Sequence, residues 1–537
     1  MKQSLKMSVS LLLVSLFLLL SACSPADQPT NESTTTGAPA NANAEQTTQA
    51  EGSEDTEAQT IEATQQGETP DSSVLRIGVL FNPSDSLDPA TVTSPGGMVL
   101  SFYVYDTLAM MTDNGLKLSL AKSITPNDKA DAFTVVLNDN VKYSDGSEVT
   151  GRDIIDSLKY FSTSPNYQSM YGNVDFENCT ADGKTAVIKL MSPAADFAIS
   201  SLGMFSPVAP KGEFKGIGAG PFIIKEGDPG TGYSLMANED YHAGTPAIKE
   251  VQLLPVLGSA AQANALLTGE IDYAWGLDAA AIKMLNSAEN IVIPESTLDS
   301  ALAKDLVLNT RVAPFNDPEV RKAAKLTIDR EKMVNTLLGE SGEIGNDMLG
   351  KGYKTYPDDI AQTTANKEEA QRIFTEKGIT EFTIVASDIV PGMVAAAEFM
   401  AQEFAEVGVN VEIKEVDPQS FFAQMAELYQ AQAFTFYWMN RPPMAEFRSQ
   451  ILKDSPYNVS GYYSDLTEEQ FKLATSNTDE KVQAEAIAKI SADIHDNGGE
   501  IIWGFQKQLA AHRKGLEGVL FSQSIPWIAD ATFVPEN

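Results

Sequence analysis

A regular pattern of apolar and polar residues begins abruptly at Val74. Residues 75–80, Leu-Arg-Ile-Gly-Val-Leu, alternate in the way that predicts a β-strand. Similar apolar or β-branched runs predict strands at 133–137, 185–190, 382–385, 409–413 and 434–438. Between them, apolar residues at helical spacing predict helices, among them 96–111, 154–161 and 420–429.

Helix boundary signals are clearest in the second half of the chain. Asp317-Pro318 places an N-cap residue before a proline at the first helical position. Asn366 begins another helix, which Gly378 should end. Strands that alternate with helices indicate an α/β fold with mostly parallel pairing and right-handed crossovers. No fixed-period repeat is visible, which argues against a solenoid or a propeller.

The segment before Val74 has the pattern of a targeting signal followed by a linker. Lys2 and Lys6 precede an apolar run at 11–20, a layout typical of a secretory signal and too short for a membrane span. Leu-Ser-Ala-Cys at 20–23 resembles a bacterial lipobox, in which the cysteine is lipidated and becomes the mature N-terminus. We therefore expect a signal peptide at 1–22 and a lipid anchor at Cys23, the alternative being an ordinary cleaved signal with an incidental cysteine.

Residues 24–73 contain no Phe, Trp, Tyr, Val, Leu or Met, and they carry ten acidic residues with no Lys or Arg. Such a stretch cannot bury enough apolar surface to offset chain entropy. We expect 23–73 to be a lipidated cysteine followed by a disordered acidic tether.

Composition and charge argue against several classes of function. The 537 residues carry a formal net charge of −35, which argues against nucleic-acid binding and against electrostatic attraction to anionic lipid. Two cysteines and three scattered histidines disfavour a disulfide framework and a metal site. The sequence has no nucleophile elbow, no HExxH motif and no phosphate-loop spacing, so we expect no catalytic residue, no metal and no cofactor.

Seven segments together resemble the bacterial extracellular solute-binding proteins of family 5, which serve ABC transporters of oligopeptides, dipeptides and nickel. The likeness runs from about Leu75 to near the C-terminus. The segments, in the family's order, are SLDPA at 86–90, VKYSDG at 141–146, VTGRDI at 149–154, GAGPF at 218–222, ANEDYH at 237–242, LNT with PFNDPEVRKA at 308–323, and IDRE at 328–331.

The resemblance implies a two-lobed periplasmic-binding-protein-like fold of type II, with an extra subdomain on lobe I and a ligand cleft between the lobes. Lobe I would comprise 74–110, 215–300 and the C-terminal return 511–537, with an insertion subdomain at 111–214 and lobe II at 301–510. The implied partners are a solute, the transmembrane subunits of a permease, and the bilayer through Cys23. A monomer on the outer face of the cytoplasmic membrane is expected.

One segment departs from the family. Peptide-binding relatives carry an Asp that pairs with the α-ammonium of the peptide, in a region where this chain has Asn440 and Arg441. A guanidinium would repel an ammonium group and could pair with a carboxylate or phosphate. A non-peptide cargo that is polar, anionic or sugar-like is therefore an alternative to a peptide, unless Arg441 points to solvent and the amine is bound elsewhere.

Four other residues are candidate ligand contacts. Trp438 and Trp275 are scarce tryptophans at strand ends, where stacking on a planar or sugar face competes with simple core packing. Met98 and Tyr103 lie in a segment that contributes to the pocket in relatives. We expect a substrate-binding lipoprotein of an ABC importer, with oligopeptide as the family-default cargo; a secreted hydrolase or a signalling lipoprotein is the alternative from another class.

Overall fold

The computed structural model describes residues 72–534, apart from positions 93, 113, 114, 299, 300, 419, 454, 456, 523 and 524. The predicted signal peptide, Cys23 and the tether up to residue 71 lie outside these residues. Within the described part of the chain, no helix is both long and apolar enough to cross a bilayer.

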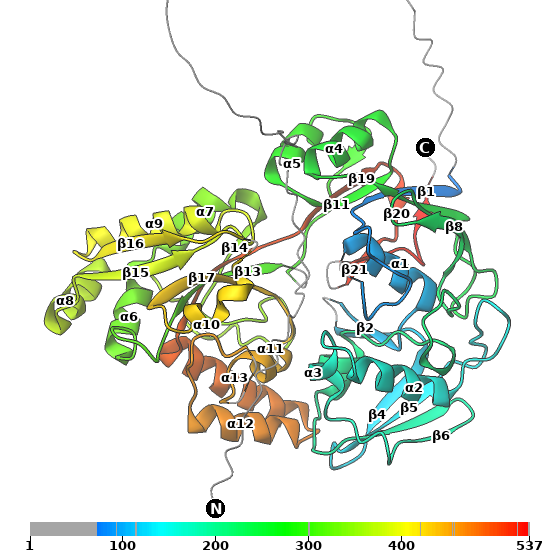
Figure 1. The fold of residues 1–537 in the computed structure, drawn as a ribbon, viewed down its shortest axis with the longest axis horizontal. Coiled ribbons are helices and arrows are strands. Elements are labelled where there is room, and N and C mark those ends of the chain that lie inside the picture. The colour runs from blue at the N-terminus through cyan, green and yellow to red at the C-terminus, as the bar shows by residue number, and fades with distance from the viewer. Residues whose placement is uncertain are drawn as a thin grey trace, which may run out of the picture.

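The chain folds into two lobes, each built on its own mixed sheet (Figure 1). The sheet of lobe I has seven strands in the order β12 (Ile291–Val292), β19 (Leu509–Arg513), β11 (Tyr273–Leu277), β1 (Val74–Val79), β10 (Glu250–Pro255), β9 (Gly232–Ala237) and β8 (Phe222–Asp228). The sheet of lobe II has six strands in the order β14 (Gly342–Ile344), β18 (Glu500–Gln506), β13 (Leu302–Leu308), β17 (Ala433–Met439), β15 (Glu381–Ala386) and β16 (Asn410–Glu415).

The sheet of lobe I joins strands from the beginning, the middle and the end of the chain. β1 runs parallel to β10 and β11, while β19 pairs antiparallel with β11 and β12. Apolar side chains of α4 (Ser259–Thr268) and α5 (Ala279–Leu285) pack on the side of β11 that carries Ala274 and Leu277. Tyr273 and Trp275, on its other side, join the core around α1 (Pro95–Tyr105).

Lobe II also has two covered faces. In its sheet, β15 runs parallel to β16 and β17, and β13 pairs antiparallel with β17 and β18. One core holds side chains of α6 (Pro318–Thr327), α7 (Arg330–Leu337), α8 (Lys367–Lys377) and α9 (Met393–Glu406). A second core includes Phe421 and Leu428, beside the short α10 (Met425–Leu428), and a satellite core joins α11 (Pro443–Gln450), α12 (Asp465–Thr475) and α13 (Glu480–Asn497).

An insertion subdomain extends the core of lobe I. Its sheet has the order β4 (Ala121–Pro126), β5 (Ala132–Leu137), β7 (Thr185–Lys189) and β6 (Thr180–Asp182), with α2 (Gly151–Ser162) and α3 (Gln168–Tyr171) beside it. Small two-stranded pairs complete the lobe: β2 (Ala109–Thr112) with β3 (Gly115–Leu118), β20 (Leu516–Glu517) with β23 (Thr532–Phe533), and β21 (Leu520–Ser522) with β22 (Ile525–Trp527).

The predicted helix boundaries of the second half are confirmed. The Asp317 side chain accepts a hydrogen bond from the backbone of Glu319, and the Asn366 side chain accepts one from Glu369. Gly378 ends α8 in the left-handed conformation, at φ 68°.

Two predicted helices were wrong in extent. The helix expected at 96–111 ends at Tyr105, because Asp106 turns the chain at φ 57° and residues 109–112 then pair with 115–118 as a hairpin. The helix expected at 420–429 is a 3₁₀ turn at Phe422–Gln424 followed by one α-helical turn, α10. The predicted domain boundaries stay predictions.

Candidate functional site between the lobes

Two chain segments connect the lobes. The first lies between β12, which ends at Val292, and β13, which begins at Leu302; the second lies between the end of β18 at Gln506 and the start of β19 at Leu509. Because both connections lie side by side at one end of the interlobe junction, they form its hinge (Figure 1).

A pocket of about 290 Å³, here called the hinge pocket, lies against these connections. Residues 294–297 and Gln508 form the hinge side of its wall, and β11, β19 and the segment 516–521 form the lobe I side. The wall includes two exposed acidic residues, Glu295 and Glu517, and no Lys or Arg lines the pocket among the described residues. The pocket is therefore suited to a polar ligand that carries a cationic group.

Tyr273 and His512 form a neutral part of that wall. Their rings stack with centroids 6.3 Å apart and an interplanar angle of 11°. Burial raises the pKa of Tyr273 and lowers the pKa of His512, so that neither side chain carries charge at neutral pH. Sequence reasoning missed both residues, although His512 was visible as one of only three histidines.

The three predicted contacts in lobe I lie at different depths. Trp275 is buried on β11 with its ring 6.2 Å from Tyr273, and its indole N–H has no hydrogen-bond partner among the described residues. Tyr103 is fully buried, and its hydroxyl donates to the carbonyl of Pro526 at 2.6 Å. Met98 is half-buried near Tyr167, with 4.0 Å between its sulfur and the Tyr167 hydroxyl. Trp275 thus lies near the hinge pocket, while Tyr103 and Met98 pack within lobe I.

In lobe II, the Asn440 side chain forms hydrogen bonds with backbone groups of three other residues. Its side-chain oxygen accepts from the backbone of Gly350 at 2.9 Å, and its amide donates to the carbonyls of Leu298 at 2.7 Å and Lys351 at 2.8 Å. Since Leu298 belongs to the first connection, Asn440 links the end of β17 to the hinge. All of its amide groups are engaged within the protein.

Trp438 and Arg441 border a group of buried acids. The indole N–H of Trp438 donates to Asp305 at 3.3 Å. Arg441 is half-buried and lies near Glu446, whose pKa its charge lowers against the stronger effect of burial. Its Nε is buried without a hydrogen-bond partner among the described residues. The structure therefore places both residues at the end of β17 in lobe II, whereas the other three predicted contacts lie in lobe I.

Burial shifts the pKa values of these acids upward, toward neutral pH. Burial raises the pKa of Glu446 to about 8 and that of Glu500 to about 7, and it raises the pKa of Asp305 as well. On β13, burial lowers the pKa of the neighbouring Lys304 to about 7. The signal that sequence reasoning overlooked was a charged Lys-Asp pair inside the otherwise apolar strand 302–308.

At the end opposite the hinge, the insertion subdomain touches lobe II. Arg448 on α11 donates to both carboxylate oxygens of Asp196, at 2.7 and 2.9 Å. The backbone N–H of Ala195 donates to the carbonyl of Thr475 at 2.7 Å. We call these two contacts the clasp.

A small apolar cluster accompanies the clasp. Tyr353 of lobe II packs with Met111 and Met204 of lobe I. The junction is thus bounded by the hinge on one side and by side-chain and backbone contacts on the other. A solute held between the lobes would be enclosed rather than laid on an open surface.

The comparisons with known proteins agree with this architecture. The model of the bacterial extracellular solute-binding proteins, family 5 (middle region) matches residues 115–458. Two curated relatives are an oligopeptide-binding protein, AppA of Bacillus subtilis, 27% identical over 330 residues, and a glutathione-binding protein, GsiB of Escherichia coli strain K12, 23% identical over 478 residues. These alignments cover 56% of this chain and 57% of AppA, and 83% of this chain and 91% of GsiB.

Among solved structures, the ABC transporter substrate-binding protein CtaP of Listeria monocytogenes matches with a TM-score of 0.73 at 22% identity, over 85% of this chain and 99% of CtaP. The chain belongs to the family 5 solute-binding proteins, and the predicted two-lobed fold is confirmed. Proteins of this family are transport receptors outside the cytoplasm and not enzymes, which removes the hydrolase alternative.

Proposed function

We propose that this protein is the lipid-anchored receptor of an ABC importer that captures a short peptide and delivers it to a permease. Cys23 anchors it as a monomer to the outer face of the cytoplasmic membrane. The oligopeptide- and glutathione-binding relatives support a peptide-like cargo. The observation that carries the proposal is the hinge pocket, which offers carboxylates and no cationic side chain among its described lining residues.

The hinge pocket supplies a place for the peptide ammonium. Asn440 cannot replace the missing carboxylate, because its amide is neutral and already bonded to three backbone groups. Glu295 in the first hinge connection and Glu517 in lobe I carry the negative charge that an α-ammonium requires. In this proposal the amine is recognised at the hinge, and Trp275 and Trp438 contribute apolar surface on either side.

The test compares free and N-acetylated di- to pentapeptides in a thermal-shift screen of the full chain. A ligand at 100 times its Kd should stabilise the protein by about 2.7 kcal/mol. Peptides with a free amine should bind, and the double variant Glu295→Gln with Glu517→Gln should weaken their binding by roughly tenfold or more. Glu289→Gln, an exposed acid of the same lobe that does not line the pocket, is the matched control.

Arg441 favours a second candidate, a cargo with a carboxylate or phosphate group. Its half-buried guanidinium keeps one N–H without a protein acceptor among the described residues. Binding of anionic solutes that is lost in Arg441→Ala, with no response to free peptides, would replace the peptide proposal. Equal binding of free and acetylated peptides would remove the hinge carboxylates from amine recognition.

A further inference from the structure

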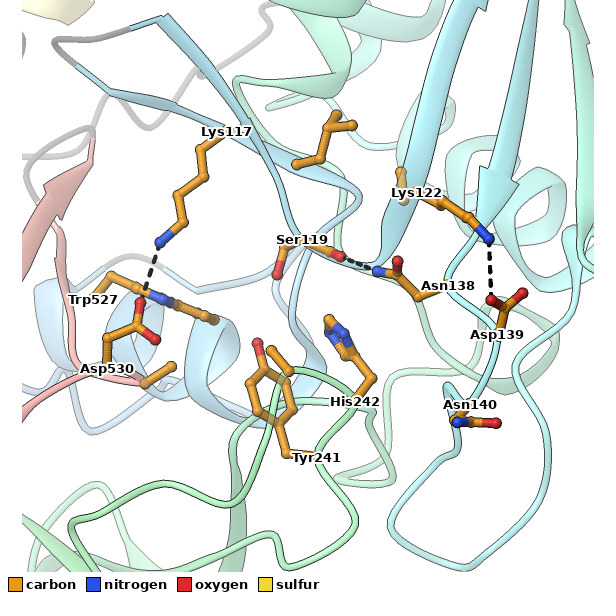
Figure 2. A pocket seen from close by; sticks show the side chains of 14 residues that line it. Lys117, Ser119, Lys122, Asn138, Asp139, Asn140, Tyr241, His242, Trp527 and Asp530 are labelled. Atoms are coloured by element: carbon orange, nitrogen blue, oxygen red, sulfur yellow. Dashed lines mark hydrogen bonds and ion pairs between the residues drawn. The ribbon is translucent and has the colours of Figure 1, made fainter.

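A second pocket, of about 560 Å³, lies within lobe I (Figure 2). It is here called the lobe I pocket. Its walls come from β3 and β4, from the turn after β5 at 138–140, from the loop 241–243 and from the segment 527–530. No residue of lobe II or of the hinge connections is among its described lining residues, so it is separate from the interlobe site.

The floor of this pocket is held in place by a buried carboxylate. Asp106 accepts hydrogen bonds from the Ser119 hydroxyl at 2.7 Å, from the Tyr241 hydroxyl at 3.0 Å and from the backbone of Thr107 at 2.6 Å. His242 Nε2 lies 3.1 Å from the same carboxylate. Ser119, Tyr241 and His242 therefore reach the pocket as fixed side chains, which lowers the entropy cost of binding a ligand there.

The backbone at Asp106 is strained. Its φ of 57° lies in the region that favours glycine, and such a conformation persists only where surrounding contacts impose it. Here the four contacts to the carboxylate impose it. Retained strain of this kind is found at ligand-binding sites, where it positions groups that an unstrained chain would not bring together.

Two exposed ion pairs stand on opposite sides of the pocket. Lys117 lies 3.2 Å from Asp530 on one side, and Lys122 lies 3.0 Å from Asp139 on the other (Figure 2). The four charges cancel. Because solvent screens exposed pairs of this kind, they add little to stability, and their main effect is to present donors and acceptors at the rim.

This arrangement selects against a charged ligand. An anion that bound a lysine would leave the carboxylate of that pair without its partner. A cation that bound a carboxylate would leave the lysine without its partner. A hydroxyl group both donates and accepts, so it can bond to the carboxylate and the ammonium of one pair together. Leu118 is an exposed apolar residue of the lining and suits the C–H face of a sugar ring.

We propose that the lobe I pocket is a second binding site, for a neutral saccharide. Its volume falls in the range of small-molecule sites. The saccharide could be a free sugar or a sugar unit of an envelope glycan, since both present the same hydroxyl groups. The site is independent of cargo capture between the lobes and adds a carbohydrate contact to the receptor.

The test measures calorimetric binding of maltose and N,N′-diacetylchitobiose to the full chain, with glucose 6-phosphate and glucosamine as charged counterparts. The neutral sugars should bind, and the double variant Lys122→Met with Asp139→Asn should weaken that binding by tenfold or more. Both side chains are exposed, so this variant should fold. Lys215→Met with Glu213→Gln removes another exposed pair of lobe I and should leave binding unchanged.

Three outcomes would overturn the proposal: no binding of either neutral sugar at millimolar concentration, binding confined to the charged counterparts, or neutral-sugar binding that the Lys122/Asp139 variant leaves unchanged. If the neutral sugars bind at the pocket, sedimentation with isolated cell-wall material distinguishes the sources. Co-sedimentation that maltose or N,N′-diacetylchitobiose reverses identifies an envelope glycan as the ligand. Sugar binding without co-sedimentation identifies a free sugar, and either result supports the site.

Discussion

Lys304 and Asp305 are neighbours in a strand whose other described residues are apolar, and their side chains point to opposite faces of the sheet of lobe II. Burial lowers the pKa of the lysine to about 7 and raises the pKa of the aspartate, so each charged form is disfavoured. Glu500 and Glu446, with pKa values of about 7 and about 8, extend the acidic group toward Trp438 and Arg441. We therefore expect the part of lobe II around the end of β17, which carries two of the candidate contacts, to be sensitive to pH.

The protonation of these acids predicts how stability depends on pH. A carboxyl whose pKa is raised on folding keeps its proton in the folded state, so its stabilising effect is present below about pH 4 and is lost as pH rises toward 7 or 8. We expect the free energy of unfolding to fall between pH 5 and pH 7, by up to about 1.4 kcal/mol per pH unit for each such carboxyl. Lys304 does not contribute in this window, because its depressed pKa affects stability only above about pH 7.

Urea unfolding of wild type and Glu500→Gln at pH 5, 6 and 7 checks this expectation. The amide imitates the protonated acid, so the variant should show a flatter dependence on pH. Glu289→Gln, at an exposed position, should keep the wild-type slope. Parallel slopes in wild type and Glu500→Gln would show that Glu500 is ionised throughout this range.

At the scale of elements, the clasp and the hinge bound the interlobe junction from opposite ends. Arg448 and Asp196 are 252 positions apart in the sequence, and Asp196 is itself buried. Because Arg448 is about one third exposed, solvent screens the pair, and its contribution is closer to that of a surface ion pair than to that of a buried one. We therefore expect the clasp to shift a balance between open and closed arrangements of the lobes without locking it.

We expect a double-mutant cycle of Arg448→Ala and Asp196→Asn to give a coupling energy of about 1 kcal/mol in thermal or urea unfolding. Arg448→Glu, which brings two negative charges together, should increase the radius of gyration measured by small-angle X-ray scattering. Arg152→Glu breaks an ion pair inside lobe I and should not change the radius. An unchanged radius in Arg448→Glu would mean that other contacts hold the lobes together.

Sequence patterns predicted elements whose signals are local. The caps at Asp317, Asn366 and Gly378 depend on backbone groups within a few residues, and the structure places all three as expected. The helix from Gly96 was predicted too long because the turn at Asp106 depends on Ser119, Tyr241 and His242, two of which are more than 130 positions away. Apolar periodicity carries no information about such contacts.

For the candidate site too, residue identities could be predicted from the sequence, but their long-range contacts could not. Trp275, Trp438 and Asn440 could be selected from residue type and family resemblance, and all three lie close to the junction. What Asn440 contacts could not be predicted, since its partners Leu298, Gly350 and Lys351 come from a hinge connection and a loop far along the chain. Whether Trp275, Trp438, Asn440, Arg441, Met98 and Tyr103 touch the cargo stays a prediction.

For the whole molecule, the dominant electrostatic fact is the net charge of −35. Like charges on one body repel, and folding brings them closer together. Salt screens this repulsion within a Debye length of about 10 Å at 0.1 M. We expect the melting temperature of the full chain to rise between about 10 and 150 mM NaCl, when measured by calorimetry in a dilute buffer.

Sucrose at equal osmolality is the control for that experiment, since it is uncharged and cannot screen. A rise in melting temperature with sodium chloride that sucrose reproduces would assign the effect to solvent exclusion. A fall with salt would show that the ion pairs of the fold outweigh the overall repulsion.

The order of strands in lobe I has a consequence for the chain during synthesis, before it folds. β19, the last long strand of the sequence, lies between β12 and β11 and borders the hinge pocket. During synthesis, lobe I has its first strand at once but lacks this one until the polypeptide is nearly finished. If the signal predicted at residues 1–22 directs export of the unfolded chain, a sheet that lacks its final strand until synthesis is nearly complete would help to keep the chain unfolded until it has crossed the membrane.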